Sequence, residues 1–262
     1  MKEKRVLIVV TPYVLALYAF SSTLAILDVL GVVPSQFPYT AVNTLLGFVF
    51  GILHGSQRLG WLRAGMLAVL VFITGLAFES IGVATGVIFG PYHYTDLLGP
   101  KFLGLVPYLI PIAWFMMVYP SYVIADRLVA ARKSFFARIL LVSLIGGVIM
   151  PAWDLGLDPM MVKAGYWAWE VQGAYFGVPV RNFLGWWLTT FTALLVFQLF
   201  SIKPRPQTSH DIPDLWVILL YAITGLSTII VDLIIGLSGP ALVGLFAMAP
   251  WAIVGFLNVN HR

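Results

Sequence analysis

Long apolar runs separated by short polar segments extend along the whole chain. A helix that crosses the ~30 Å hydrocarbon core of a bilayer needs roughly 17–25 mainly apolar residues, and several runs reach this length. The pattern predicts an all-α, polytopic integral membrane helix bundle with about eight transmembrane helices. Their predicted ranges are 6–30, 38–53, 62–83, 103–125, 137–153, 182–202, 214–235 and 240–257.

Two segments between these helices, 84–102 and 154–181, are much longer than the other connections. Both are rich in aromatic residues, Gly and Pro, and poor in Ser and Lys. Flexible linkers have a different composition. We therefore expect two ordered loops that pack across the mouth of the bundle.

Composition supports a membrane protein. Of the 262 residues, 60% are hydrophobic and 10% are charged, whereas a soluble domain is about half apolar and a quarter charged. So apolar a chain is expected to have hydrocarbon as its solvent, and residues 1–262 are interpreted as a single transmembrane domain. Cysteine is absent, which excludes disulfides, thiolate catalysis and Cys-bound metal centres.

Lysine and arginine are distributed unequally between alternate loops. With the predicted helices, twelve fall on the side of the termini and three on the side of the long loops. Because cytoplasmic loops carry the excess of basic residues, we expect a multi-pass protein of the cytoplasmic membrane with both termini cytoplasmic. The same pattern accounts for the net charge of +4 without a nucleic-acid partner.

Four acidic residues lie in or at the edge of the predicted helices: Asp28, Glu79, Asp154 and Asp232. Each lies near the end of a helix that runs towards the long loops, so all four are expected at one depth. Contact with headgroup water is an equally good explanation for Asp28 and Asp232. For Glu79 a function is favoured, because the glycines around it permit either close helix packing or space for a ligand.

Two further features surround the start of the second long loop. Asp158 precedes Pro159, as a helix N-cap does before a proline at the first helical position. Asp154 lies four residues earlier and could share a face and a proton with Asp158. Glu170 is expected to be solvated at the interface.

Acidic and aromatic residues together suggest chemistry through a carbocation. A buried carboxyl group can remain protonated and donate to an alkene, and aromatic rings stabilise the resulting cation by ~0.5–2 kcal/mol each. No metal-ligand, diphosphate-binding, Walker or dinucleotide motif is present. The expected substrate is a lipid alkene, and the product is an alcohol if water captures the cation, or a ring.

Two long segments resemble signatures of a known family. The first is ESIGVATGVIFGPYHYTDLLGPK from Glu79 to Lys101, followed by Val106-Pro107 and a Pro-Ile-Ala-Trp run that ends at Trp114. The second contains Trp153-Asp154, Leu157-Asp158-Pro159, a Tyr-Trp-Ala-Trp run at 166–169, Tyr175 to Pro179 and Asn182. Over about residues 75–190, the chain resembles the carotenoid biosynthesis membrane proteins, which include CruF-type carotenoid end-group hydratases of the bisanhydrobacterioruberin hydratase kind.

The resemblance implies a hydro-lyase that adds water across the terminal C1',2' double bond of an acyclic (ψ) carotenoid end, without a cofactor or metal. The acidic positions of the two signatures, taken as catalytic candidates, are Glu79, Asp96, Asp154 and Asp158. The candidate substrate-binding residues are Tyr92, Tyr94, Trp114, Trp153, Tyr166, Trp167, Trp169, Tyr175 and Asn182. The implied partners are a carotenoid within the lipid bilayer and, as a further possibility, other membrane enzymes of the pathway.

From the residues we predict that Glu79 and Asp154 line one cavity beneath Tyr92, Tyr94, Trp167 and Trp169, with Asp154 preferred as proton donor. Two alternatives remain open. A lycopene cyclase-type isomerase would begin with the same protonation, and a non-catalytic isoprenoid-binding membrane protein would use the acids structurally. The mass and spectrum of the product distinguish all three.

Overall fold

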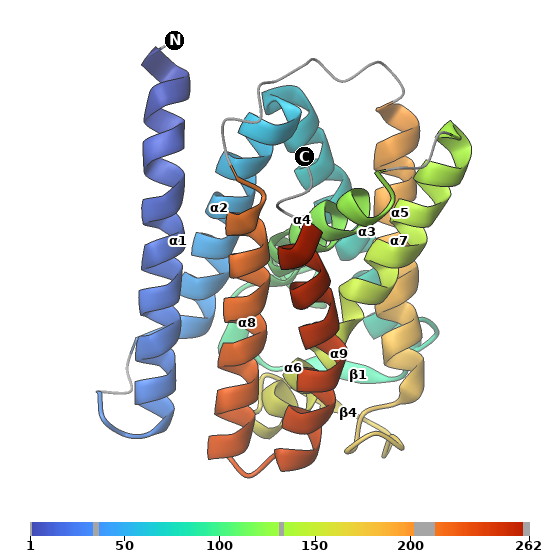
Figure 1. The fold of residues 1–262 in the computed structure, drawn as a ribbon. Coiled ribbons are helices and arrows are strands. Elements are labelled where there is room, and N and C mark those ends of the chain that lie inside the picture. Colours follow the sequence, from blue (N-terminus) through green and yellow to red (C-terminus); the bar gives the residue numbers. More distant parts are fainter. Residues whose placement is uncertain (1, 34–36, 131–133, 202–212, 259–262) are drawn as a thin grey trace.

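The fold was obtained as a computed structural model that describes residues 2–33, 37–130, 134–201 and 213–258. These residues form a bundle of long helices with two small antiparallel pairs of strands at one end (Figure 1). The helices are α1 (Lys2–Val29), α2 (Tyr39–Leu59), α3 (Trp61–Thr85), α4 (Leu109–Leu128), α5 (Phe135–Ile149), α6 (Pro151–Lys163), α7 (Val180–Phe200), α8 (Leu215–Ile234) and α9 (Ser238–Leu257), with a short 3₁₀ helix at Asp96–Leu98.

The predicted all-α membrane bundle is confirmed. Seven spans within the described residues are long and apolar enough to cross a bilayer, one of them formed by α5 and α6 together. The helix α2 has 21 residues but is not among the seven, since His54, Gln57 and Arg58 reduce its apolar character. The number eight therefore stays a prediction. The most enclosed span is α4, in which every residue from Trp114 to Asp126 is buried.

The predicted end of the fifth helix at residue 153 is wrong. The chain remains helical through Met150 at the junction of α5 and α6, and continues to Lys163. Pro151 is tolerated because it occupies the first turn of α6, where a missing N–H costs little. The hydroxyl of Tyr221 donates to the carbonyl oxygen of Ile149 at 3.1 Å, so a carbonyl at this junction has a side-chain partner.

Pro159 lies inside α6 rather than at its start. A proline there leaves the carbonyl four residues earlier without its helical donor. The Tyr175 hydroxyl takes that place and donates to the carbonyl oxygen of Leu155 at 2.7 Å. The predicted role of Asp158 as an N-cap is therefore wrong, because Asp158 is an interior residue of a helix that begins at Pro151.

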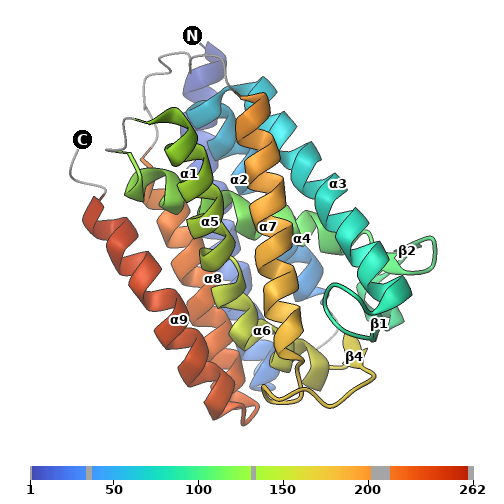
Figure 2. The same cartoon turned by 90° about the vertical axis from the view of Figure 1, so that its right-hand side faces the viewer.

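The two long loops are ordered, as predicted, and they pair with each other. Strand β1 (Tyr92–Tyr94) from the first loop is antiparallel to β4 (Trp167–Trp169) from the second. Within the first loop, β2 (Lys101–Phe102) pairs with β3 (Val106–Pro107). We call this end of the bundle the loop end; the start of α1 and the end of α9 lie at the opposite, terminal end (Figure 2).

A buried ionic network joins the helices at the terminal end. Arg58 on α2 donates to Asp126 on α4 at 3.0 Å and to Asp214, next to α8, at 2.8 Å. Arg127 also donates to Asp214, at 2.6 Å, and Arg138 on α5 donates to Asp126 at 2.6 Å. Although burial opposes ionisation, the two arginines beside Asp214 hold the pKa of that carboxyl below its usual value.

Candidate active site

A cavity of about 360 Å³ lies inside the bundle at the loop end. Residues from α1, α2, α3, α4, α6, α7 and α8 line it, and β1 and β4 contribute to its wall. The side chains of Glu79, Asp158, Trp114, Trp153 and Tyr166 are among the lining groups. A cavity of this size holds one end of a long lipid rather than the whole molecule.

The pairing of β1 with β4 places four aromatic residues in the cavity wall. Tyr92 is opposite Trp169 and Tyr94 is opposite Trp167. Because side chains alternate across a strand, these four occupy one face of the two-stranded sheet, while His93 between them is exposed. Burial, and then the nearby charge of Glu79, raise the pKa of both tyrosines, so their hydroxyls remain hydrogen-bond donors.

Glu79 lies on α3 with only 3% of its surface exposed. One carboxylate oxygen accepts hydrogen bonds from the hydroxyls of Tyr92 and, at 2.9 Å, Tyr94. The other accepts the indole N–H of Trp114 at 3.0 Å. Gly75, one turn before Glu79, leaves room for the Trp114 indole, since a Cβ at this position would lie 3.1 Å from the ring. The glycine thus permits close packing of an aromatic donor.

Asp158 on α6 is the second acid in the cavity wall. Its Oδ1 accepts the indole N–H groups of Trp167 at 2.9 Å and Trp169 at 3.0 Å. Its Oδ2 accepts from the Asn182 amide at 2.7 Å. A carboxylate offers about four lone-pair positions, so Asp158 and Glu79, with three donors each, both keep one position for a ligand.

Asp154 lies one helical turn before Asp158 and shares its amide partner. Asn182 donates to Asp154 Oδ2 at 2.6 Å as well as to Asp158. Asp154 is fully buried, its Oδ1 has no partner among the described residues, and it is not a cavity-lining residue. The expectation that Asp154 itself lines the cavity with Glu79 is therefore corrected: Asp158 does so, and Asp154 lies behind it.

Other candidates lie farther from the acids. Asp96 is almost fully exposed and pairs with Lys101 at 2.8 Å; this hydrogen bond and the lysine charge lower the pKa of Asp96. It is not a lining residue and is not brought to the other three acids. Tyr175 supports α6 through Leu155 rather than lining the cavity, and Glu170 is exposed as expected.

The two remaining membrane acids differ from each other. Asp28 lines the cavity, whereas Asp232 is fully buried outside its lining, packed against Gly156. Neither oxygen of Asp232 has a partner among the described residues. Its burial argues against simple contact with headgroup water.

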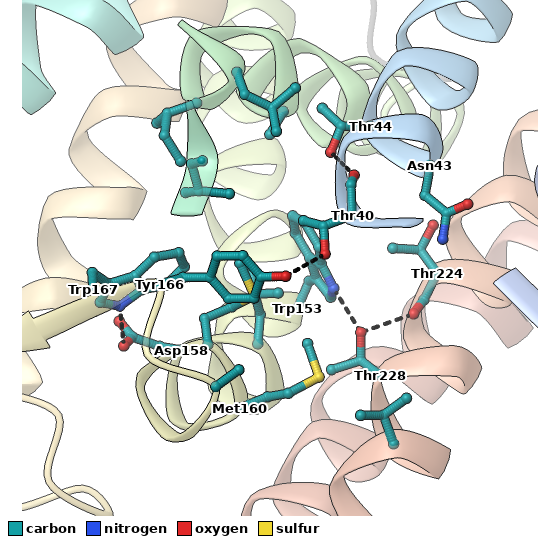
Figure 3. A pocket seen from close by; sticks show the side chains of 18 of the residues that line it. Thr40, Asn43, Thr44, Trp153, Asp158, Met160, Tyr166, Trp167, Thr224 and Thr228 are labelled. Atoms are coloured by element: carbon teal, nitrogen blue, oxygen red, sulfur yellow. Dashed lines mark hydrogen bonds between the residues drawn. The ribbon is translucent and has the colours of Figure 1, made fainter. Parts of the chain in front are cut away.

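Sequence reasoning missed a polar wall of the cavity. It is formed by residues of α1, α2 and α8, and Figure 3 shows part of it across Trp153 and Tyr166 from Asp158. Its principal members are Tyr18, Ser22, Asn43, Thr224, Ser227 and Thr228. The available signal was the spacing of Thr224, Ser227 and Thr228 on the mainly apolar helix α8, since residues three or four positions apart share a helix face.

The site combines buried carboxyl groups, neutral donors and aromatic rings in an apolar space. Among the described residues, the hydrogen bonds to Glu79 and Asp158 come from Tyr, Trp and Asn rather than from a basic side chain. Such groups can hold a proton, transfer it and stabilise a cation.

Comparison with known proteins places the chain in a family. Residues 39–250 match the model of a family described as carotenoid biosynthesis protein. Over 136 residues, 52% of this chain, the sequence is 34% identical to bisanhydrobacterioruberin hydratase of Haloarcula japonica, and the match covers 45% of that relative's length. No solved structure matches the chain.

Proposed function

The chain belongs to the carotenoid biosynthesis protein family, and from this premise we propose that it is a carotenoid hydratase. It adds water across the C1',2' double bond of an acyclic (ψ) end group and forms a tertiary alcohol. The name of the relative, a hydratase, supports this reaction class. The carotenoid reaches the site from the bilayer, and only its end enters the cavity.

The observation that carries the proposal is the pair of cavity-lining acids among aromatic rings. Glu79 and Asp158 are both buried, and both belong to the same cavity. Rings from Trp114, Trp153 and Tyr92 line the space between the helices. A carotenoid end contains only hydrocarbon, so protonation is the available way to activate it, and ring faces then stabilise the cation.

We assign proton donation to Asp158. Asp154 and Asp158 share Asn182 within one helical turn, and two close carboxyl groups in a low-dielectric site hold one proton between them. Asp158 is the member of the pair that lines the cavity, so it transfers the proton. Asp154, the donor preferred from sequence, becomes a positioning residue that keeps the pair partly protonated.

Glu79 has the complementary role. Unlike Asp158, Glu79 shares none of its three donors, Tyr92, Tyr94 and Trp114, with a second carboxyl group, so we assign it the carboxylate form, whose charge these hydrogen bonds stabilise. A fixed negative charge near the tertiary carbon stabilises the cation. In the reaction, the Asp158 O–H bond and the C1'=C2' π bond break and a C–H bond forms at C2'. Water then bonds to C1', and one O–H bond of that water breaks and releases its proton to solvent.

The decisive experiment is expression of the chain in membranes that contain an acyclic carotenoid such as lycopene. Hydration should add the mass of one water for each reacting end. An unchanged mass with a shifted spectrum would instead indicate a cyclase-type isomerase, and an unchanged carotenoid would indicate a binding protein. Asp158→Asn should abolish the added mass while the protein level remains unchanged.

We also propose the orientation and surroundings of the protein. The excess of Lys and Arg on the side of the termini supports a cytoplasmic-membrane protein with cytoplasmic termini and the loop end outside. Reporter fusions at Thr95 and Arg132 should then report opposite sides. Other membrane enzymes of the carotenoid pathway are proposed neighbours, since an apolar product must pass between them within the bilayer.

A further inference from the structure

The polar wall of α1, α2 and α8 has no role in the acid chemistry described so far. It faces the same cavity as Asp158 and Glu79. Figure 3 shows Asn43, Thr224 and Thr228 on one side of Trp153 and Tyr166, with Asp158 and Trp167 on the other. The cavity therefore has an acidic wall and a hydroxyl-rich wall, separated by aromatic and apolar side chains.

The hydrogen atoms of the α8 hydroxyls are already used. Thr224 donates to the carbonyl oxygen of Leu220 at 2.8 Å, Thr228 donates to that of Thr224 at 3.0 Å, and Ser227 donates to that of Ile223. Each hydroxyl has one hydrogen and two lone pairs. These hydroxyl groups can therefore accept hydrogen bonds from a ligand but cannot donate one.

Two contacts from neighbouring elements strengthen this character. Because the Thr224 hydrogen is engaged, the 2.7 Å contact between Tyr18 and Thr224 makes Tyr18 the donor. The Trp153 indole N–H donates to Thr228 at 3.0 Å. Tyr18 and Trp153 thus donate their hydrogens to hydroxyl oxygens within the wall. The remaining lone pairs of the wall oxygens can accept hydrogen bonds from a ligand.

Three oxygens of the same wall have no partner among the described residues. They are Oγ of Ser22 and Oδ1 of Asp28 on α1, and Oδ1 of Asn43 on α2, and all three residues line the cavity. A buried polar atom without a partner costs roughly 1–3 kcal/mol. This cost is avoided if a small hydrogen-bond donor occupies the cavity beside them.

We propose that this wall binds the water molecule that attacks the carbocation, an inference that rests on the proposed hydratase function. Water can supply both of its hydrogens to an acceptor-rich surface. Its lone pairs then point away from the wall, into the cavity and towards the acidic side. The alkene lies between the walls, so the proton arrives on one face and water on the other.

The wall also contains a group that can take up the released proton. Asp28 is the carboxyl residue from α1 in the cavity lining, and its free Oδ1 can accept. When the water oxygen bonds to C1', one water O–H bond breaks and its proton passes to Asp28. The alcohol leaves neutral, Asp28 releases its proton to solvent, and the Asp158 pair regains one proton from solvent.

The test separates cation formation from capture by water. In D₂O, Asp158 delivers deuterium to C2'. If no water captures the cation, it loses a proton again, and unhydrated carotenoid is recovered with deuterium incorporated. The measured quantity is the ratio of deuterium exchange to hydration, obtained by mass spectrometry of extracted carotenoids from membranes with equal amounts of each variant.

Asn43→Leu is the primary variant, because the Asn43 Oδ1 has no partner to lose among the described residues. The paired change Tyr18→Phe with Thr224→Val removes both sides of one hydrogen bond, so neither partner is left unsatisfied. Both variants, and Asp28→Asn, should raise the exchange-to-hydration ratio about tenfold, as expected for loss of one or two hydrogen bonds to water.

Thr189→Val is the matched control. Thr189 is a buried threonine on α7 that bonds to its own helix at Gly185 and is not a lining residue. Its ratio should equal that of the wild type. If Asn43→Leu and the paired variant also keep the wild-type ratio, water is held elsewhere and the inference is overturned. If the wild type shows neither hydration nor exchange, the proposed function itself is wrong.

Discussion

The two ends of the bundle both contain buried acids, but they provide opposite partners for them. At the terminal end, Asp126 and Asp214 receive hydrogen bonds from Arg58, Arg127 and Arg138. At the loop end, the donors to Glu79 and Asp158 among the described residues are neutral, from Tyr, Trp and Asn. Arginine is always charged and fixes its partner as a carboxylate, whereas neutral donors allow a carboxyl group to gain and lose a proton.

The comparison shows that burial of an acid does not by itself indicate its role. Ionised pairs at the terminal end link α2, α4, α5 and the start of α8, and removal of one partner leaves an uncompensated charge. At the loop end, Glu79 and Asp158 have Tyr, Trp and Asn as their hydrogen-bond donors within the described residues, and they adjoin a cavity. We therefore interpret the first cluster as structural and the second as reactive.

The largest expected effect comes from Asp158. Asp158→Asn should preserve the fold, because Asn still fills the space, but reduce hydration by ~10²–10⁴ as for loss of a general acid. Asp154→Asn should cause a smaller loss. Hydrated carotenoid should be quantified in membranes with equal protein. If Asp158→Asn retains wild-type turnover, the assignment of Asp158 as donor is incorrect.

Disruption of the terminal end should affect folding instead. Arg58→Met leaves Asp126 and Asp214 short of a buried partner, and such a change costs ~3–5 kcal/mol. We expect low protein levels and a lower thermal midpoint in detergent. Arg138→Met is the control, since Arg138 is partly exposed and makes one of these ion pairs. If Arg58→Met has normal stability but reduced hydration activity, the interpretation of the terminal-end cluster as structural is contradicted.

An intermediate effect is expected at the donors to Glu79. Tyr94→Phe removes one of the two hydroxyls that bond to a single carboxylate oxygen. A hydrogen bond to a charged group is worth about 1.5–3 kcal/mol, so hydration should fall at least about tenfold. Tyr108→Phe, at an exposed tyrosine, should have no effect. Equal activity of the two variants would remove Glu79 from the proposed mechanism.

The smallest effect is expected at Asp96. Its carboxylate is almost fully exposed and pairs with Lys101, and exposed pairs contribute little. Asp96→Asn should leave hydration within about twofold of wild type, because Lys101 still donates to the Tyr94 carbonyl at 2.8 Å. A large loss of activity would show that the acidic site extends beyond the cavity.

The sequence by itself determined the membrane bundle, most helix positions and the ordered loops. The helices were predictable because hydropathy is a local sum over each helix. The ordered loops were predictable because aromatic-rich segments have enough apolar surface to pack. It also identified Glu79, Asp154 and Asp158 as an unusual group. It failed at the end of the fifth helix, where Pro151 resembles a terminator but fits the first turn of a continuing helix.

The tertiary structure decided which groups face each other. One turn of α6 separates Asp154 from Asp158, and only the positions of α7 and β4 determine that Asp158 lines the cavity. The polar wall joins α1, α2 and α8, whose contacting residues Tyr18 and Thr224 are 206 positions apart. No local sequence pattern predicts this contact, because it depends on how whole helices pack against one another.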